Sequence, residues 1–430
     1  MTAIIIMIIF LLLMGAGMPV NFVLGLIGVG GLFFLAGGVP ALDSAALVAW
    51  SSMDSFTLTA IPLFILMGEV ILRTGVSKDL FDAAVAWFGQ LRGGLGIATI
   101  FASGIFAAVS GSSAAGAATM GILAAPEMER FGYKKRLIYG TLTAGGSLAI
   151  LIPPSVILII YASFTEQSVG KLFLAGFIPG FILILLFVMM IAVWTRMDPD
   201  AAPTPDIRLT LREKIRESKG VLPFIFLMVV CLGSIYAGVA TPTEAAGLGA
   251  AGSIVLALIL GRFSWNILVD SLLNTVKTTS MVLFLILGGS ILSNLFLFQN
   301  LPNQVLEFAV GLGLPTWALL VMLYLLYLVA GCFIDGLTIM VVTLPIVAPL
   351  IQNMGYSLIW FGIAMVVLVE LSQLTPPVGM NLYIIKNVTG AKIEDVMMGS
   401  LPFVISIMVC LIFVTVFPSL ALYLPELLMR

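Results

Sequence analysis

A pair of adjacent prolines interrupts a long apolar run at two places in this chain, Pro153-Pro154 and Pro376-Pro377. The two pairs are 223 positions apart. The same offset aligns three further prolines: Pro19 with Pro242, Pro126 with Pro349, and Pro179 with Pro402. A shared spacing of this kind indicates a tandem duplication, with a first half at about 1–195, a linker at 196–220 and a second half at about 221–420. The fold must therefore be built from two copies of one unit.

The segments between these prolines are apolar. The 430 residues are 61% hydrophobic and 9% charged, whereas a soluble domain carries about 25% charged residues. Apolar runs separated by short charged loops are typical of transmembrane helices. The first run lacks the basic start of a cleavable signal, so we interpret it as a permanent span. The sequence predicts an all-α polytopic membrane protein.

Several classes of protein are disfavoured by what the sequence lacks. There is no histidine, and Cys231, Cys332 and Cys410 lie inside apolar runs without metal-ligand spacing. A zinc or di-iron membrane enzyme would lack its commonest ligand. A serine nucleophile at Ser110 or Ser112 would have neither a histidine nor a lysine at membrane depth as its base. We therefore predict no enzymatic activity and no nucleic-acid partner.

Each half is predicted to contain the same series of segments. In the first half these are scaffold helices within 1–72 (spans 3–16, 20–36 and 56–72), an amphipathic arm at 77–91, a hairpin at 94–125, a broken span at 137–162 and a span at 172–194. In the second half they are scaffold and arm at 221–298 (spans 221–239, 245–260 and 280–298, with an amphipathic segment at 262–279), an amphipathic segment at 301–311, a hairpin at 316–349, a broken span at 357–385, a span at 397–417 and a tail at 421–430.

The hairpins are predicted to enter the membrane without crossing it. Their arms are short: 94–109, 114–125, 316–331 and 338–349. At about 1.5 Å per residue, roughly 12–16 residues do not cross a hydrocarbon core of about 30 Å. Each pair of arms is therefore interpreted as a re-entrant hairpin.

Basic residues give the orientation. Five full crossings in each half force the second half into the opposite orientation. With the linker in the cytoplasm, every Lys and Arg among the 19 except Lys171 and Arg430 falls on the cytoplasmic side, as the positive-inside rule requires. Both termini are then periplasmic. Inverted repeats with hairpins entering from both faces are typical of secondary transporters.

The first hairpin turns at Ser110-Gly111-Ser112-Ser113, a run of small residues with three hydroxyl groups. One interpretation is close helix packing, which small residues permit. The other is that the tip exposes carbonyl oxygens and hydroxyls to a hard cation. The facing broken span contains Gly146-Ser147 and then Pro153-Pro154-Ser155, where two missing amide donors must open the helix.

The second hairpin turns at Gly331 to Thr338, and its Asp335 is the repeat mate of Ser112. A carboxylate at membrane depth costs at least about 2.5–3.5 kcal/mol unless it is paired or solvated, so we interpret Asp335 as a cation ligand. Thr375 and Asn381 flank the second break. The predicted Na⁺-binding residues are Ser110, Gly111, Ser112, Gly146, Ser147, Gly331, Asp335, Gly336, Thr375 and Met380, and the predicted substrate-binding residues are Ser112, Ser113, Ser155, Asp335, Thr375 and Asn381.

Two further acids lie within predicted spans. Glu69 is interpreted as structural, whereas Glu370, the repeat mate of Ser147, is either a lining residue of the second site or a structural hydrogen-bond partner. No Lys or Arg lies within a predicted span or hairpin, so an anionic solute would depend on helix N-termini, hydroxyls and bound Na⁺. Two matched sites predict at least two Na⁺ ions.

These motifs resemble those of a known family. Ala108 to Ser113, followed by Gly132-Tyr133 and Ile152 to Ser155, is similar to the large membrane (M) subunit, DctM-like, of tripartite ATP-independent periplasmic (TRAP) transporters. Gly331 to Gly336 and Leu374 to Gly379 match its second half. The similarity covers essentially the whole chain. Nothing precedes the first span, so we expect the small subunit not to be fused.

The resemblance implies an elevator-type importer in the bacterial inner membrane, driven by a sodium gradient. It implies a small four-helix membrane partner (Q type), a periplasmic substrate-binding protein (P type) and membrane lipid around the scaffold. The hairpins and broken spans would form the moving domain, and the amphipathic segments would lie along the interface as arms. Ser110, Ser112, Ser155 and Asp335 fall on motifs tied to transport. Solutes carried by such families include C4-dicarboxylates, sialic acids and other sugar acids.

Two other functions are left open by these features. The nearest is a stand-alone sodium/dicarboxylate symporter of the same superfamily, which would move solute without a binding protein. A purely structural membrane scaffold is the other, and in a scaffold the replacement of Asp335 would leave transport unaffected.

Overall fold

The computed structural model describes residues 2–204, 209–376 and 379–429, and side chains from Ile5 onward. Within these ranges every regular element is a helix, as the sequence predicts. The helices up to the linker are α1 (Thr2–Gly15), α2 (Val20–Leu35), α3 (Val39–Met53), the 3₁₀ helix η1 (Phe56–Thr59), α4 (Ala60–Arg73), α5 (Val76–Phe88), α6 (Gly94–Ser110), α7 (Ser113–Arg130), α8 (Lys135–Leu151), α9 (Val156–Thr165) and α10 (Val169–Met197).

The remaining helices follow a short 3₁₀ turn, η2 (Pro199–Ala201). They are α11 (Leu211–Ser218), α12 (Leu222–Tyr236), α13 (Pro242–Ile259), α14 (Trp265–Phe298), α15 (Leu301–Gly311), α16 (Thr316–Gly331), α17 (Gly336–Asn353), α18 (Leu358–Leu374), α19 (Met380–Thr389), α20 (Ile393–Val416) and α21 (Ser419–Leu428).

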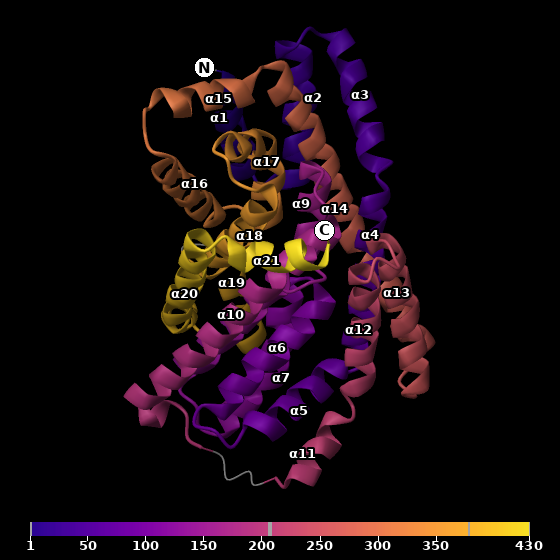
Figure 1. The fold of residues 1–430 in the computed structure, drawn as a ribbon, viewed down its shortest axis with the longest axis vertical. Helices are drawn as coiled ribbons and strands as arrows, with labels where there is room; N and C mark the ends of the chain where they lie inside the picture. Colours follow the sequence, from indigo (N-terminus) through magenta and orange to yellow (C-terminus); the bar gives the residue numbers. More distant parts are fainter. Residues whose placement is uncertain (1, 205–208, 377–378, 430) are drawn as a thin grey trace.

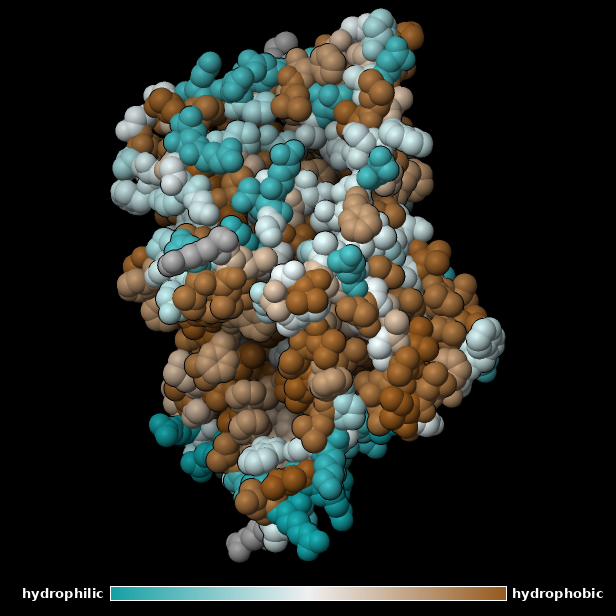
Figure 2. Space-filling model, turned by 45° about the vertical axis from the view of Figure 1, so that its right-hand side comes forward, coloured by the Kyte–Doolittle hydropathy of each residue, from teal (hydrophilic) through white to brown (hydrophobic). Residues whose placement is uncertain are grey.

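Seven helices of the described chain are long and apolar enough to cross a membrane, with α8 and α9 together forming one of them, or eight if the bent pair α11 and α12 forms one span. Apolar side chains also cover much of the surface. Figure 2 shows hydrophobic residues gathered over the lower half of one face, above a hydrophilic lower end. Exposed Phe, Leu, Ile and Met side chains in such numbers fit a protein whose solvent is lipid.

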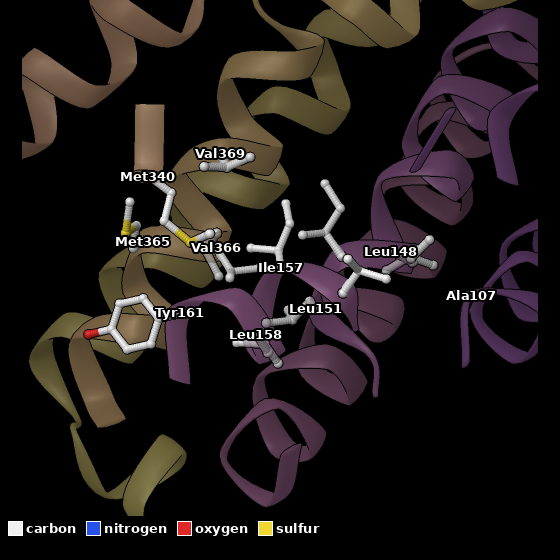
Figure 3. Packing of buried hydrophobic residues seen from close by; sticks show 14 of the residues in the cluster. Ala107, Leu148, Leu151, Ile157, Leu158, Tyr161, Met340, Met365, Val366 and Val369 are labelled. Carbon is white, nitrogen blue, oxygen red and sulfur yellow. The ribbon is translucent and has the colours of Figure 1, made fainter. Parts of the chain in front are cut away.

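The centre of the molecule is formed by α8, α9 and α18. Every residue from Leu137 to Leu151 in α8 is buried, and so is nearly all of α18. Figure 3 shows buried side chains of α8, α9, α17 and α18 gathered in one cluster. A helix that is apolar and buried on all sides lies in the core and does not face lipid. The two helices that end at proline pairs are therefore the central pair.

The two helix hairpins point toward this centre from opposite ends. In Figure 1, α6 and α7 lie in the lower half near α5 and α11, whereas α16 and α17 lie in the upper half below α15. The packing is crossed, because α7 packs against α19 and α17 packs against α9. Each hairpin thus contacts the half-helix that follows the other hairpin's break.

Some predicted bounds differ from the observed ones. In each hairpin the second arm is longer than predicted: α7 extends to Arg130 and α17 extends to Asn353. Pro126, Pro345 and Pro349 lie inside these helices, where each removes one hydrogen bond without ending the helix. α17 has 18 residues and is long enough to cross a membrane, so arm length alone does not identify it as re-entrant.

Three other segments also differ. The predicted arm at 262–279 and the predicted span at 280–298 form the single 34-residue helix α14, since no Gly or Pro separates them. Residues 39–53, to which no element was assigned, form α3. The linker contains α11, which starts with a capping box in which Thr210 and Glu213 bond each other's backbone N–H groups.

Candidate functional site

The first hairpin turns on a glycine between two serines. α6 ends at Ser110, Gly111 has a φ of +55°, and Ser112 is the N-cap of α7. The Ser112 Oγ accepts a hydrogen bond from the Ala115 N–H at 3.4 Å, and the Ser110 Oγ donates to the Ser112 carbonyl at 3.5 Å. The cap satisfies one of the amides that a helix start leaves free. The tip therefore presents a helix N-terminus, which carries partial positive charge.

This tip lies against the break between α8 and α9. A side-chain carbon at Gly111 would lie 3.2 Å from the Pro154 carbonyl oxygen, so the two backbones are nearly in contact. Ser155, at the N-cap position of α9, is fully buried, and its Oγ has no hydrogen-bond partner among the described residues. A buried hydroxyl in that state is available to a bound ion or solute.

Close packing of α7 on α8 depends on Gly146. A side-chain carbon there would lie 2.5 Å from the Ala117 Cβ, closer than two carbons can approach. The neighbouring Ser147 is fully buried and donates its hydroxyl to the Ala144 carbonyl of its own helix at 2.8 Å. Gly146 thus has a clear packing role, and Ser147 keeps only oxygen lone pairs for another partner.

The second hairpin begins its return helix with a carboxylate cap. Asp335 Oδ1 accepts hydrogen bonds from the N–H groups of Leu337 at 3.1 Å and Thr338 at 3.2 Å, and its Oδ2 accepts from the Thr338 hydroxyl. The sequence-predicted mates Ser112 and Asp335 therefore occupy the same structural position, the N-cap of the second hairpin arm. The hydrogen bonds that Asp335 makes to Leu337 and Thr338 are explained by its role as a helix cap.

The tip of the second hairpin lies against α18. A side-chain carbon at Gly331 would lie 2.4 Å from the Ser372 Oγ, and one at Gly336 would lie 2.1 Å from a Val369 methyl. Both glycines are buried and permit the close approach of two backbones. Two of the residues predicted for the second ion site, Gly331 and Gly336, thus lie at the contact between this hairpin and α18.

The second break separates α18 from α19. Thr375 donates its hydroxyl to the Leu371 carbonyl at 2.6 Å, and Gly379 has a φ of +28° just before α19. Pro377 and Val378 of the predicted motif lie outside the described residues. Met380 is 44% exposed and points away from the interior, so its predicted part in an ion site could come only from its backbone.

Two predicted substrate-binding residues from opposite halves bond each other. The Asn381 Nδ2 donates to the Ser113 Oγ at 2.7 Å, and the Ser113 Oγ lies 3.0 Å from the Asn381 Oδ1. Both side chains are buried. Ser113 starts α7 and Asn381 is near the start of α19, so the N-termini of two helices meet at this contact. Converging helix N-termini favour the binding of an anion.

The two additional acids have opposite surroundings. Glu69 accepts from the Asn274 Nδ2 at 2.9 Å and pairs with Arg73 at 3.3 Å, which supports the structural interpretation. Glu370 is fully buried, and although its carboxyl group lies beside the Leu151 backbone, neither oxygen makes a hydrogen bond of good geometry with a described residue. The Gln373 Oε1 is likewise unpartnered, and Gln373 was missing from the predicted site. Its signal was a third polar side chain, after Glu370 and Ser372, within one apolar run.

Comparison with known proteins agrees with this architecture. Residues 6–420 match the family model described as "Tripartite ATP-independent periplasmic transporter, DctM component". The chain is 36% identical to a C4-dicarboxylate TRAP transporter large permease protein of Pseudomonas aeruginosa, over 92% of each chain, and 31% identical to a sialic acid TRAP transporter large permease protein of Vibrio cholerae, over 96% of each. The solved YdaH transporter of Alcanivorax borkumensis has a similar fold, with a TM-score of 0.65 over 98% of this chain and 99% of that one at 14% identity.

Proposed function

This chain belongs to the TRAP transporter large-permease (DctM) family, and from that premise we propose that it imports an organic acid across the bacterial inner membrane on a sodium gradient. The observation that carries the proposal is the meeting of Ser113 and Asn381, at the starts of helices from opposite halves, beside two broken helices. The solute's carboxylate would bind at these helix N-termini. Na⁺ would be held by the tip hydroxyls, the carbonyls freed at the breaks, and Asp335.

We also propose that the two halves form an inverted repeat. Its support is that a shift of 223 positions carries the bounds of α7 and α8 onto those of α17 and α18. The crossed packing of α7 on α19 and of α17 on α9 is what a two-fold pseudo-symmetry would produce. In the orientation that the basic residues favour, the linker containing α11 is cytoplasmic and both termini are periplasmic.

An elevator mechanism is proposed on the same basis. The hairpins and broken helices pack around one buried centre and would move as a unit against the scaffold formed by α2, α4, α13 and α14. Na⁺ would have to bind before the solute, because the described interior offers no basic side chain to an anion. A small four-helix subunit would widen the scaffold, and a periplasmic binding protein would deliver the solute.

The relatives' names suggest the class of solute. They include a C4-dicarboxylate and a sialic acid transporter, and both solutes carry at least one carboxylate. We propose a carboxylate solute for this chain also. A site made of helix N-termini, hydroxyls and bound Na⁺ would recognise the carboxylate and leave much of the choice between acids to the delivery protein.

Uptake into proteoliposomes tests this function. The chain would be reconstituted with a small TRAP membrane subunit and a TRAP binding protein from the same organism, and uptake of radiolabelled succinate and of sialic acid would be followed. We expect uptake of one of them with an inward Na⁺ gradient, and none when Na⁺ is replaced by choline. Equal uptake in choline would exclude sodium coupling. Uptake without the binding protein would favour the stand-alone symporter.

A further inference from the structure

An apolar groove runs between three helices on the outside of the molecule. It has a volume of about 590 Å³ and lies between α6, α10 and α12, and Ile152 and Pro153 of the first helix break also line it. The groove is open at the side, since Phe181 is 59% exposed and Val229 is 62% exposed. It shares no predicted ion or solute residue with the site described above.

The groove follows almost the whole length of α12. From this helix it takes a single face that begins at Phe224 and ends at Tyr236. Twelve steps at about 1.5 Å make this wall roughly 18 Å long. One leaflet of a bilayer has a hydrocarbon depth of about 15 Å, half of a core of about 30 Å. The groove is therefore slightly longer than one leaflet is deep, which is long enough to hold one extended lipid tail.

The chemistry of the walls matches such a tail. The lining side chains are aliphatic or aromatic, and only the Tyr236 hydroxyl is polar. Water gains no hydrogen bonds in such a groove at membrane depth, so hydrocarbon is the species available to fill it. A ligand with a charged or polar body would lose its hydration there without compensation.

The end of the groove at the start of α12 has the character of a membrane surface. The short helix α11 directly precedes it and exposes Leu211 and Ile215, one turn apart. The same segment carries exposed basic residues, among them Arg216 and Lys219, which is three positions before α12. Exposed apolar residues beside basic ones are typical of a helix in the headgroup layer, where Lys and Arg attract lipid phosphate.

We propose that this groove is a phospholipid-binding site, with one acyl chain along α12 and the phosphate near Lys219. The occupant is a lipid of the leaflet that contains α11, and anionic headgroups are preferred. Under the function proposed above, α6, which is an arm of the first hairpin, would move relative to α12, which lies in the predicted scaffold, so the tail would lie between a moving wall and a static one. The lipid site itself does not depend on that motion.

Gly233 offers a clean way to block the groove. It lines the groove, and a Cβ atom there meets nothing within 4 Å, so Gly233→Leu can start its side chain in open space and extend it into the groove. Gly247, in the neighbouring α13, has equally open surroundings but does not line the groove, so Gly247→Leu is the matched control. Thermal unfolding midpoints equal to that of the wild type in both variants would show that neither substitution disturbs the fold.

The test is photo-crosslinking in nanodiscs with phosphatidylglycerol that carries a diazirine on one acyl chain. We expect labelled peptides from 101–108 and 224–236 in the wild type and in Gly247→Leu, and at least a several-fold loss of this labelling in Gly233→Leu. Lys219→Glu should reduce labelling by phosphatidylglycerol more than labelling by phosphatidylcholine. Labelling unchanged by Gly233→Leu, or a groove found crosslinked to the small membrane subunit, would overturn the proposal.

Discussion

Ser113 and Asn381 are 268 positions apart in the chain, and they bond each other through both the oxygen and the nitrogen of the Asn381 amide. Ser113 lies at the turn of one hairpin, and Asn381 lies just after the helix break that follows the other. This contact joins the two halves at the place where the sequence predicts solute binding. The contribution of this contact to the free energy of unfolding can be measured.

A double-mutant cycle measures the coupling free energy between Ser113 and Asn381. Ser113→Ala leaves the Asn381 amide unpaired in a buried site, and Asn381→Ala leaves the Ser113 hydroxyl unpaired. Each single change should lower the free energy of unfolding by about 1–3 kcal/mol, the usual cost of an orphaned buried polar group. The double variant should cost clearly less than the sum, because the two changes remove one shared contact. Additive losses would show that the bond is not energetically coupled.

Gly146 gives a second prediction, on packing. Alanine in place of glycine stabilises an ordinary helix by about 0.5–1 kcal/mol. At Gly146 the added carbon collides with Ala117, so Gly146→Ala should instead lower stability by about 1–3 kcal/mol. Gly30 in α2 has nothing within 4 Å and provides the control. Chemical or thermal unfolding should give opposite signs for Gly146→Ala and Gly30→Ala, and equal signs would contradict this packing of α7 on α8.

Glu370 gives a third prediction, in which one substitution has different effects on stability and on transport. Its carboxyl group is fully buried without a hydrogen bond of good geometry to a described residue, and such a group destabilises the fold. Glu370→Met should therefore raise or preserve the unfolding midpoint, while transport falls if the carboxyl serves the cycle. Glu69→Met is the matched change at a carboxylate with two partners, and its midpoint should fall. A lower midpoint for Glu370→Met would indicate a structural role.

Much of this arrangement could be predicted from the sequence, because breaks and tips have strong local signals. Proline pairs end α8 and α18, and the observed bounds of α15 and α16 are the predicted ones. Helix α3 was missed because its polar residues, including Asp43, weaken the apolar signal of a span. The second arm of each hairpin was predicted too short, since α7 continues past Pro126 and α17 past Pro349.

The site itself was only partly readable. The residue types at the two tips indicate hydroxyl and carboxylate ligands, but which of them meet depends on tertiary packing. Nothing in the local sequence pairs Ser113 with Asn381, since α7 and α19 come from different halves. The outward direction of Met380 also follows from the turn at Gly379, whose backbone angles no local pattern specifies.

Asp335 caps α17 and is also proposed to bind Na⁺. Substitutions at this residue can test the two roles separately, and they give the most direct test of ion binding. Asn caps a helix about as well as Asp, so Asp335→Asn should keep the fold while it removes the charge. Asp335→Ala should lose the cap as well, at a cost of about 1 kcal/mol.

The decisive measurement is the thermal unfolding of the purified protein in NaCl and in choline chloride at equal ionic strength. A ligand that binds only the folded state raises its stability with concentration. The account predicts a higher midpoint in Na⁺ for the wild type and a much smaller Na⁺ effect for Asp335→Asn, with both midpoints similar in choline. Equal midpoints for the wild type in the two salts, or an undiminished Na⁺ effect in Asp335→Asn, would contradict it.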